Sequence, residues 1–109
     1  DQGRKLEEAK GMITKALAAD PDNPAYLDSM GWVLFKLGDV EAAREHLERA
    51  TTLPRGEDST ILDHLAETYN KLGDHEKAVE TWKKALELEQ ADKHPDQKII
   101  DRINSKLAE

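Results

Sequence analysis

The chain has 109 residues, which is enough for one domain with a modest hydrophobic core. Charged residues make up 36% of it and aromatic residues 5%, a balance that favours solvent-facing helices over a β-sandwich. The 23 acidic residues outnumber the 16 basic ones and give a formal net charge of -7. We therefore expect no nucleic acid among the partners, because nucleic-acid binding needs a basic face.

Cysteine is absent, which excludes disulfides and thiolate metal sites. No apolar run approaches the roughly 18 residues of a membrane-spanning helix, so we expect no membrane insertion. The sequence opens on Asp1 and enters a helical pattern almost at once. That start is typical of a piece cut from a longer protein, so the location in the cell stays open.

Apolar residues recur three and four positions apart in the first half of the chain, which predicts three amphipathic helices. Pro21 breaks the first helix, and Asn23 can cap the second. Gly38 is the expected left-handed terminator of the second helix, and Asp39 caps the third. The three predicted helices cover residues 2–19, 24–37 and 40–53.

The second half of the chain repeats this organisation. Gly73 and Asp74 form the same kind of turn as Gly38 and Asp39. A last helix starts at Pro95 and carries one narrow stripe of isoleucine and leucine. The rest of its surface is charged, as suits the solvating helix at the end of a stack. The predicted helices here cover residues 58–72, 75–90 and 95–108.

The chain contains an internal repeat. Gly38 and Gly73 are 35 positions apart, and Ala43 lies 34 positions after Ala9. A helix–turn–helix unit of 34 residues, with one residue inserted between two copies, explains both spacings. Small residues recur where helix axes must approach closely, and large residues recur where gaps need filling. The small set is Gly31, Ala43, Ala50, Ala66, Ala78 and Ala85, and the large set is Leu34, Leu47, Tyr69 and Trp82.

The residues at these positions resemble the signature of the tetratricopeptide repeat (TPR) family. That signature has an aromatic or Leu, a Leu-Gly-like pair and an aromatic, followed by Ala, an aromatic, Ala and Pro. One copy here reads Leu27, Met30, Gly31, Leu34, Ala43, Leu47, Ala50 and Pro54. A second copy reads Leu62, Leu65, Ala66, Tyr69, Ala78, Trp82 and Ala85, and half a copy precedes both with Ala9, Ile13, Ala16 and Pro21.

The resemblance implies an all-α fold in which helix–turn–helix repeats stack as a right-handed α-solenoid of about six helices. We expect a single TPR domain over residues 1–109. Its parts are the second helix of a truncated repeat at 2–23, repeats at 24–57 and 58–91, and a C-terminal capping helix at 95–108. The amino-acid sequence around Met30 is similar to repeats of large bacterial TPR proteins, including envelope lipoproteins. Bacterial cytoplasm and the periplasmic side of the cell envelope are therefore both open as locations.

In TPR proteins the concave face is lined by the first helix of each pair and holds an extended peptide or a partner helix. The resemblance therefore implies a protein-interaction scaffold whose partner is a protein or peptide. Candidate residues for this face lie on the two first helices, off the core stripe. They are Asp28, Trp32, Phe35, Lys36, Asp63, Glu67, Asn70 and Lys71.

Trp32 and Phe35, which we call the aromatic shelf, would lie beside a row of carboxylates from Asp28, Asp63 and Glu67. We therefore expect a ligand with basic and apolar residues. The acidic tails of heat-shock chaperones, which a subset of the family binds, are not expected, because the carboxylates would repel them. Two plainer interpretations stay open. The aromatics pack against the preceding helix or a missing upstream repeat, and the carboxylates form an ordinary solvated surface.

An alternative function is structural, with the repeats extending a solenoid or mediating self-association of a larger protein. The apolar side of the first helix, including Met12, lacks the partner helix that would precede it, so it either packs back on the helix of Leu27 or contacts another copy of the chain. We expect a monomer that tends to form a homodimer through that edge. The glycines form no phosphate loop, and the four histidines form no H-x-x-x-H pair. We therefore expect no enzyme activity, no metal site and no cofactor.

Overall fold

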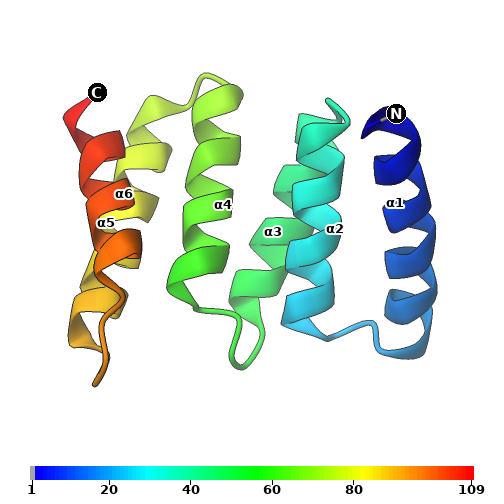
Figure 1. Cartoon of the computed structure of the whole chain (residues 1–109), viewed down its shortest axis with the longest axis horizontal. Helices are drawn as coiled ribbons and strands as arrows, with labels where there is room; N and C mark the ends of the chain where they lie inside the picture. Colours follow the sequence, from blue (N-terminus) through cyan, green and yellow to red (C-terminus); the bar gives the residue numbers. More distant parts are fainter. Residues whose placement is uncertain (1) are drawn as a thin grey trace.

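In the computed structural model, residues 2–109 are described, and they form six α-helices and no strand. The helices are α1 (Gln2–Ala19), α2 (Pro24–Lys36), α3 (Val40–Thr52), α4 (Ser59–Lys71), α5 (His75–Ala91) and α6 (Gln97–Ala108). Figure 1 shows them side by side in chain order, with α2 and α3 forming one hairpin and α4 and α5 the next. The predicted all-α architecture is confirmed.

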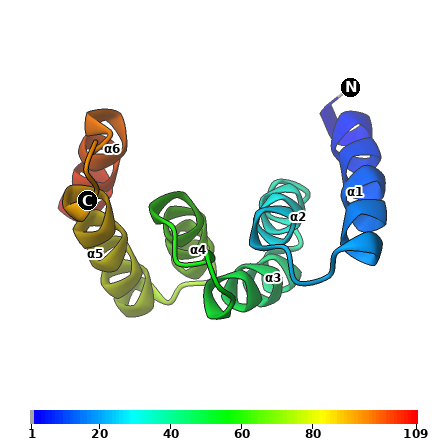
Figure 2. The ribbon, with the colours of Figure 1, turned by 90° about the horizontal axis from the view of Figure 1, so that it is seen from below.

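The helices follow an arc, which is seen end-on in Figure 2. α2 and α4 lie on its inner side, α3 and α5 lie on its outer side, and α1 and α6 stand at its two ends. α1 packs on α2, α3 packs on α4, and α6 packs on α5. The fold is therefore an α-solenoid whose concave side comes from the first helix of each pair.

Both helical hairpins turn at a glycine. Gly38 and Gly73 have φ angles of 92° and 88°, in the left-handed region that residues with a Cβ rarely enter. The N–H of Gly38 donates to Phe35 O at 3.0 Å, and the N–H of Asp39 donates to Leu34 O at 2.9 Å. The carboxylate of Asp39 then caps α3, so one pair of residues ends a helix and starts the next.

Small residues at the repeat positions let the helices approach closely. The alanines Ala43, Ala50, Ala66, Ala78 and Ala85 are all fully buried. A Cβ added to Gly31 would stand 2.6 Å from Cγ of Leu47, so α2 and α3 could not keep their spacing around a larger residue. Leu47 and Trp82 are buried between the helices, as their size predicts.

α6 begins at Gln97, two residues later than the sequence indicates. The side chain of Asp96 accepts from the N–H of Lys98 at 2.9 Å, so Asp96 is the N-cap and Pro95 stays outside the helix. The N–H of Asp96 donates to Glu89 Oε2 at 2.9 Å. This contact ties the start of α6 to the end of α5.

Tyr69 links α4 to α3, because its hydroxyl donates to Glu48 Oε2 at 2.6 Å. Burial of the phenol and this hydrogen bond raise the pKa of Tyr69 above its ordinary value of 10.0. The folded state therefore holds the phenol proton more tightly than the unfolded chain does. Its contribution to stability is complete below the unfolded pKa and is lost as the pH rises towards the folded one.

We expect the free energy of unfolding to fall above about pH 10, and Tyr69→Phe to flatten that fall. Urea titrations followed by circular dichroism at about pH 8 and about pH 11 measure the difference. Tyr26, which lies exposed on α2, is the control: Tyr26→Phe should leave the alkaline fall unchanged. An equal loss of stability at high pH in wild type and Tyr69→Phe would show that this phenol is not its source.

Candidate partner-binding face

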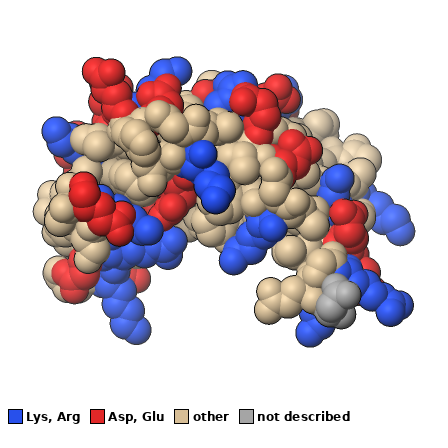
Figure 3. All heavy atoms as spheres, turned by 90° about the horizontal axis from the view of Figure 1, so that it is seen from above, with Lys and Arg blue, Asp and Glu red and all other residues tan. Residues whose placement is uncertain are grey.

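Figure 3 shows a hollow between the two ends of the arc. The inner helices α2 and α4 lie behind it, and α1 and α6 border it. Lys and Arg side chains (blue) lie along the border, including the end of the arc at the left of the view. All eight residues predicted for the concave face lie on the inner helices α2 and α4.

The aromatic shelf is ordered by its neighbours. Trp32 and Phe35 stack with ring centroids 4.8 Å apart. His64 of α4 stacks on Trp32 with centroids 4.2 Å apart, and the ammonium of Lys36 lies 5.6 Å from the Trp32 ring centroid. Trp32 is half-buried and contacts the next inner helix through His64. Phe35 packs against the core cluster of Met30, Leu34 and Ala43, which α1 also contacts through Ile13 and Leu17. The interpretation in which the aromatics pack against the preceding helix or a missing upstream repeat therefore stays a prediction.

The indole N–H of Trp32 reaches the surface without an acceptor among residues 2–109. Those residues contain no buried side-chain nitrogen or oxygen that lacks a partner, and this N–H forms no hydrogen bond, so it is open to solvent. The indole of Trp82 differs, since its N–H is buried and donates to Asp63 Oδ1 at 2.9 Å. The shelf thus combines apolar ring surface with one available donor.

Asp28 holds His64 in place. Its Oδ1 lies 2.7 Å from His64 Nδ1, and the two side chains have exposed fractions of 17% and 15%. With the imidazole neutral, Nδ1 carries the proton and donates it to this carboxylate. Asp28 therefore acts on the shelf by fixing the ring that stacks on Trp32.

Asp63 does not line an open groove, in contrast to the prediction. It is 4% exposed. Its Oδ1 accepts from Trp82 of α5, and its Oδ2 lies 3.2 Å from Nε of Arg102 of α6. Residues of α5 and α6 therefore cover this carboxylate of α4.

The remaining predicted residues of α4 have different surroundings. Glu67 Oε1 lies 2.9 Å from Nζ of Lys106 in α6, and this hydrogen bond raises the pKa of Lys106 above its ordinary value. Asn70 Oδ1 lies 2.5 Å from His75 Nδ1, across the turn between α4 and α5. Lys71 is exposed. The carboxylate row is thus engaged within the chain, and the lysine is available.

Three further residues contact the predicted ones on this face and were not predicted from the sequence. They are His64, Arg102 and Lys106. Asp28 and His64 are 36 positions apart, about one repeat, which is a spacing that predicts contact between neighbouring first helices. Arg102 and Lys106 are four apart on α6, as their acceptors Asp63 and Glu67 are four apart on α4. This matched spacing was the available signal.

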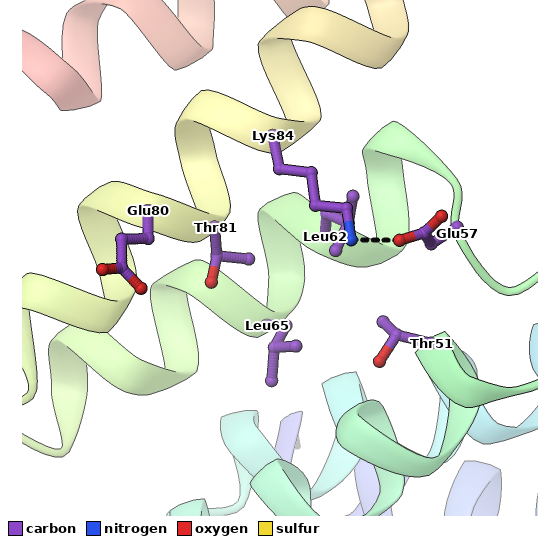
Figure 4. A pocket seen from close by; sticks show the side chains of 7 residues that line it. All are labelled: Thr51, Glu57, Leu62, Leu65, Glu80, Thr81 and Lys84. Atoms are coloured by element: carbon purple, nitrogen blue, oxygen red, sulfur yellow. Dashed lines mark ion pairs between the residues drawn. The ribbon is translucent and has the colours of Figure 1, made fainter.

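A second hollow lies between α3, α4 and α5, outside the concave face (Figure 4). Its volume is about 280 Å³, just below the range of roughly 300 to 1,000 Å³ that is usual for small-molecule sites. Lys84 forms an ion pair with Glu57 there, so its charge is already compensated. The lining residues are Thr51, Glu57, Leu62, Leu65, Glu80, Thr81 and Lys84. We assign no ligand to this hollow.

Residues 2–109 contain no cluster of three or more His, Cys, Asp or Glu side chains arranged to hold a metal ion. Over the same residues, none of the helices has the length and apolar character needed to cross a membrane.

Stacked helical hairpins with a side-chain-lined concave face define a helical-repeat protein of the α-solenoid class. A family profile described as "Tetratricopeptide repeat" matches residues 1–60, and a second profile with the same description matches residues 59–92. The chain therefore belongs to the tetratricopeptide repeat family, as its repeat predicts.

A TPR repeat-containing protein of Pseudomonas aeruginosa is 39% identical over 67 residues, which are 62% of this chain and 11% of that protein. The chain thus spans about a tenth of the length of this curated relative.

Two solved structures show the same fold with a bound segment. The complex of PcrH with the chaperone binding region of PopD has a TM-score of 0.85 at 20% identity, over 98% of this chain and 79% of that one. The first TPR of Spaghetti (RPAP3) bound to the HSP90 peptide SRMEEVD has a TM-score of 0.75 at 24% identity, over 99% of this chain and 84% of that one. At these identities the likeness concerns the fold alone.

Proposed function

We propose that this TPR domain is a protein-interaction module that holds a peptide or a partner helix on its concave face. The observation that carries the proposal is the half-buried aromatic shelf, which is ordered by His64 and has a free indole N–H. The PcrH complex supports it, because a similar fold there holds a region of another protein.

The apolar part of the ligand contacts Trp32 and Phe35. Because both rings are already stacked, binding costs little further side-chain entropy. Large aromatic residues of this kind are common hot spots in protein interfaces. The N–H of Trp32 can donate to a backbone carbonyl of the ligand, and an extended peptide offers one at every residue.

The basic part of the ligand engages the carboxylates of the inner face. Two of these carboxylates already pair with basic side chains, Arg102 and Lys106 of α6. These pairs support a preference for Lys or Arg in the ligand. Basic ligand side chains would replace these two, or would approach Asp28 beside the shelf. This preference differs from the acidic sequence of the HSP90 peptide held by the RPAP3 domain.

A displayed peptide library selected against the folded domain tests the proposal. We expect selected peptides to combine apolar residues with Lys or Arg. Trp32→Ala should weaken their binding about thirtyfold or more, the equivalent of the 2 kcal/mol of a hot-spot residue. Isothermal titration calorimetry gives the dissociation constants.

Tyr26→Ala is the matched control, because Tyr26 is an exposed aromatic residue on another face of the same helix. Its effect on affinity should stay within about twofold. Peptides that bind Trp32→Ala as tightly as wild type would refute the role of the shelf. A selection that returns acidic peptides would refute the basic preference.

The alternative function is self-association. Met12 of α1 is 72% exposed, and no residue of α1 is buried, so this helix presents apolar surface that a second copy could cover. Sedimentation velocity at high concentration separates the two functions. A dimer that is lost in Met12→Lys favours self-association, and a monomer that still binds the selected peptides excludes it.

A further inference from the structure

α6 packs on α5 and reaches α4 with the side-chain chemistry proposed for a ligand. Nε of Arg102 lies 3.2 Å from Oδ2 of Asp63, and Nζ of Lys106 lies 2.9 Å from Oε1 of Glu67. Each pair of partners is separated by four positions along its own helix. The two ion pairs therefore join successive turns of α4 to successive turns of α6.

α6 is held through one face. Ile100 and Ile103 are buried, and Ile99 and Leu107 pack against the main core cluster. An isolated helix of this length is marginal in water, so α6 is ordered mainly by the surface it packs on. The side chain of Arg102 is 52% exposed, whereas that of its partner Asp63 is 5% exposed. A short helix that packs through one face opens locally at a lower cost than the whole domain.

α4 lies between α6 and the aromatic shelf (Figure 2). Asp63 and His64 are consecutive residues of α4 and point in different directions. The first pairs with Arg102 of α6, and the second stacks on Trp32 of α2. A partner in the place of α6 would therefore contact the same inner helix that orders the shelf.

We propose that the surface of α4 and α5 beneath α6 is an exchangeable docking site for a basic amphipathic helix, and that α6 is its resident occupant. This inference rests on the proposed function and specifies the ligand. The partner helix carries Arg or Lys at two positions four residues apart, beside a stripe of isoleucine or leucine. It docks by displacing α6 and takes over the ion pairs with Asp63 and Glu67.

Displacement is a competition between a tethered helix and a free one. The short connection of residues 92–96 gives α6 an effective concentration of roughly millimolar order at this surface. A free helix with identical contacts therefore binds the intact chain weakly. It binds far better once the resident helix is loosened, and this difference can be measured.

The probe is a dye-labelled synthetic peptide with the sequence of residues 95–109, and the protein is the full chain. Arg102→Glu together with Lys106→Glu loosens α6 and leaves the acceptors on α4 intact. We expect amide hydrogen exchange in α6 to speed up about tenfold or more, and fluorescence anisotropy to show the probe binding about tenfold or more tightly than to wild type.

The control variant Lys93→Glu with Lys98→Glu makes the same change of charge at two exposed lysines near the start of α6. It should leave both readouts as in wild type. A probe that carries Glu at the positions of Arg102 and Lys106 should not bind the loosened chain. Ile103→Ala, at a fully buried position of α6, is a second way to loosen the helix.

Faster exchange in α6 without tighter probe binding would overturn the inference, because the uncovered surface would then not be a docking site. Unchanged exchange in both loosened variants would also overturn it, because α6 would not be exchangeable. Trp32 is unchanged in all of these variants, so a failure of this inference is distinguishable from a failure of the aromatic shelf in the Trp32→Ala experiment.

Discussion

Trp82→Ala is expected to cost about 3–5 kcal/mol of the free energy of unfolding, the usual range for removing a large aromatic residue from a core. Trp82 is 3% exposed and lies in the main core cluster with residues of α2, α3, α4 and α6. Its removal leaves a cavity at the junction of α4, α5 and α6. It also leaves Oδ1 of the buried Asp63 without its donor. Urea denaturation followed by circular dichroism measures the loss.

Trp82→Phe separates the two causes. The phenyl ring keeps much of the packing but cannot donate to Asp63, so we expect a loss of about 1–3 kcal/mol, the cost of a buried acceptor without its partner. Because domains of this size have only about 5–15 kcal/mol of stability, the Phe variant keeps the test valid even where the Ala variant unfolds. Equal stability of Trp82→Phe and wild type would mean that the hydrogen bond to Asp63 is unimportant.

Gly56→Ala is expected to cost about 3 kcal/mol or more, at the upper end of the usual range for overpacking. Gly56 is buried in the connection between α3 and α4, and its N–H donates to Leu53 O at 2.9 Å. A Cβ there would stand 1.6 Å from the backbone oxygen of Ala50. Backbone cannot move aside as a flexible side chain can, so the end of α3 or the whole connection must shift.

Two other glycines provide a graded control. A Cβ on Gly11 of α1 meets no atom within 4 Å, so Gly11→Ala should stabilise the helix by up to about 1 kcal/mol. Gly31→Ala meets the side chain of Leu47 and should fall between the other two. Thermal unfolding of the three variants should therefore rank them Gly11→Ala, Gly31→Ala, Gly56→Ala from most to least stable. Any other order would contradict this account of the contacts.

The helices and turns were predictable from the sequence because their signals are local. Gly38 and Gly73 mark left-handed turns, and Asp39 caps the helix that follows. The repeat adds a second source of information, since it assigns buried positions such as Ala43 and Ala78 by their spacing alone. Local signals and repeat spacing agree along the chain, and such agreement allows the fold to be predicted from the sequence.

The candidate site was only partly predictable, because exposure depends on which helix lies above a residue. Asp63 and Trp32 both lie off the core stripe of their helices, and the sequence treats them alike. In the structure Arg102 and Trp82 cover Asp63, whereas Trp32 stays half-buried with a free donor. That difference comes from α5 and α6, whose contacts with Asp63 are long-range and are not encoded by periodicity.

Among the predicted residues, Trp32 keeps an N–H without an acceptor and Lys71 is exposed, whereas Glu67 is paired with Lys106 of α6. The site is best described as a shelf next to a covered row of carboxylates. A ligand that uses both must compete with Arg102 and Lys106. Under the proposed exchange of α6, the affinity for a basic partner would depend on how readily α6 opens.

The most direct test of the central claim is a map of backbone amide shifts, recorded by nuclear magnetic resonance while a selected peptide is added to the domain. We expect the largest shifts on the inner helices, around Trp32 and Phe35 of α2 and His64 of α4, with smaller shifts in α6. Shifts concentrated on the outer helices α3 and α5 would contradict it, because the partner would then bind the convex side.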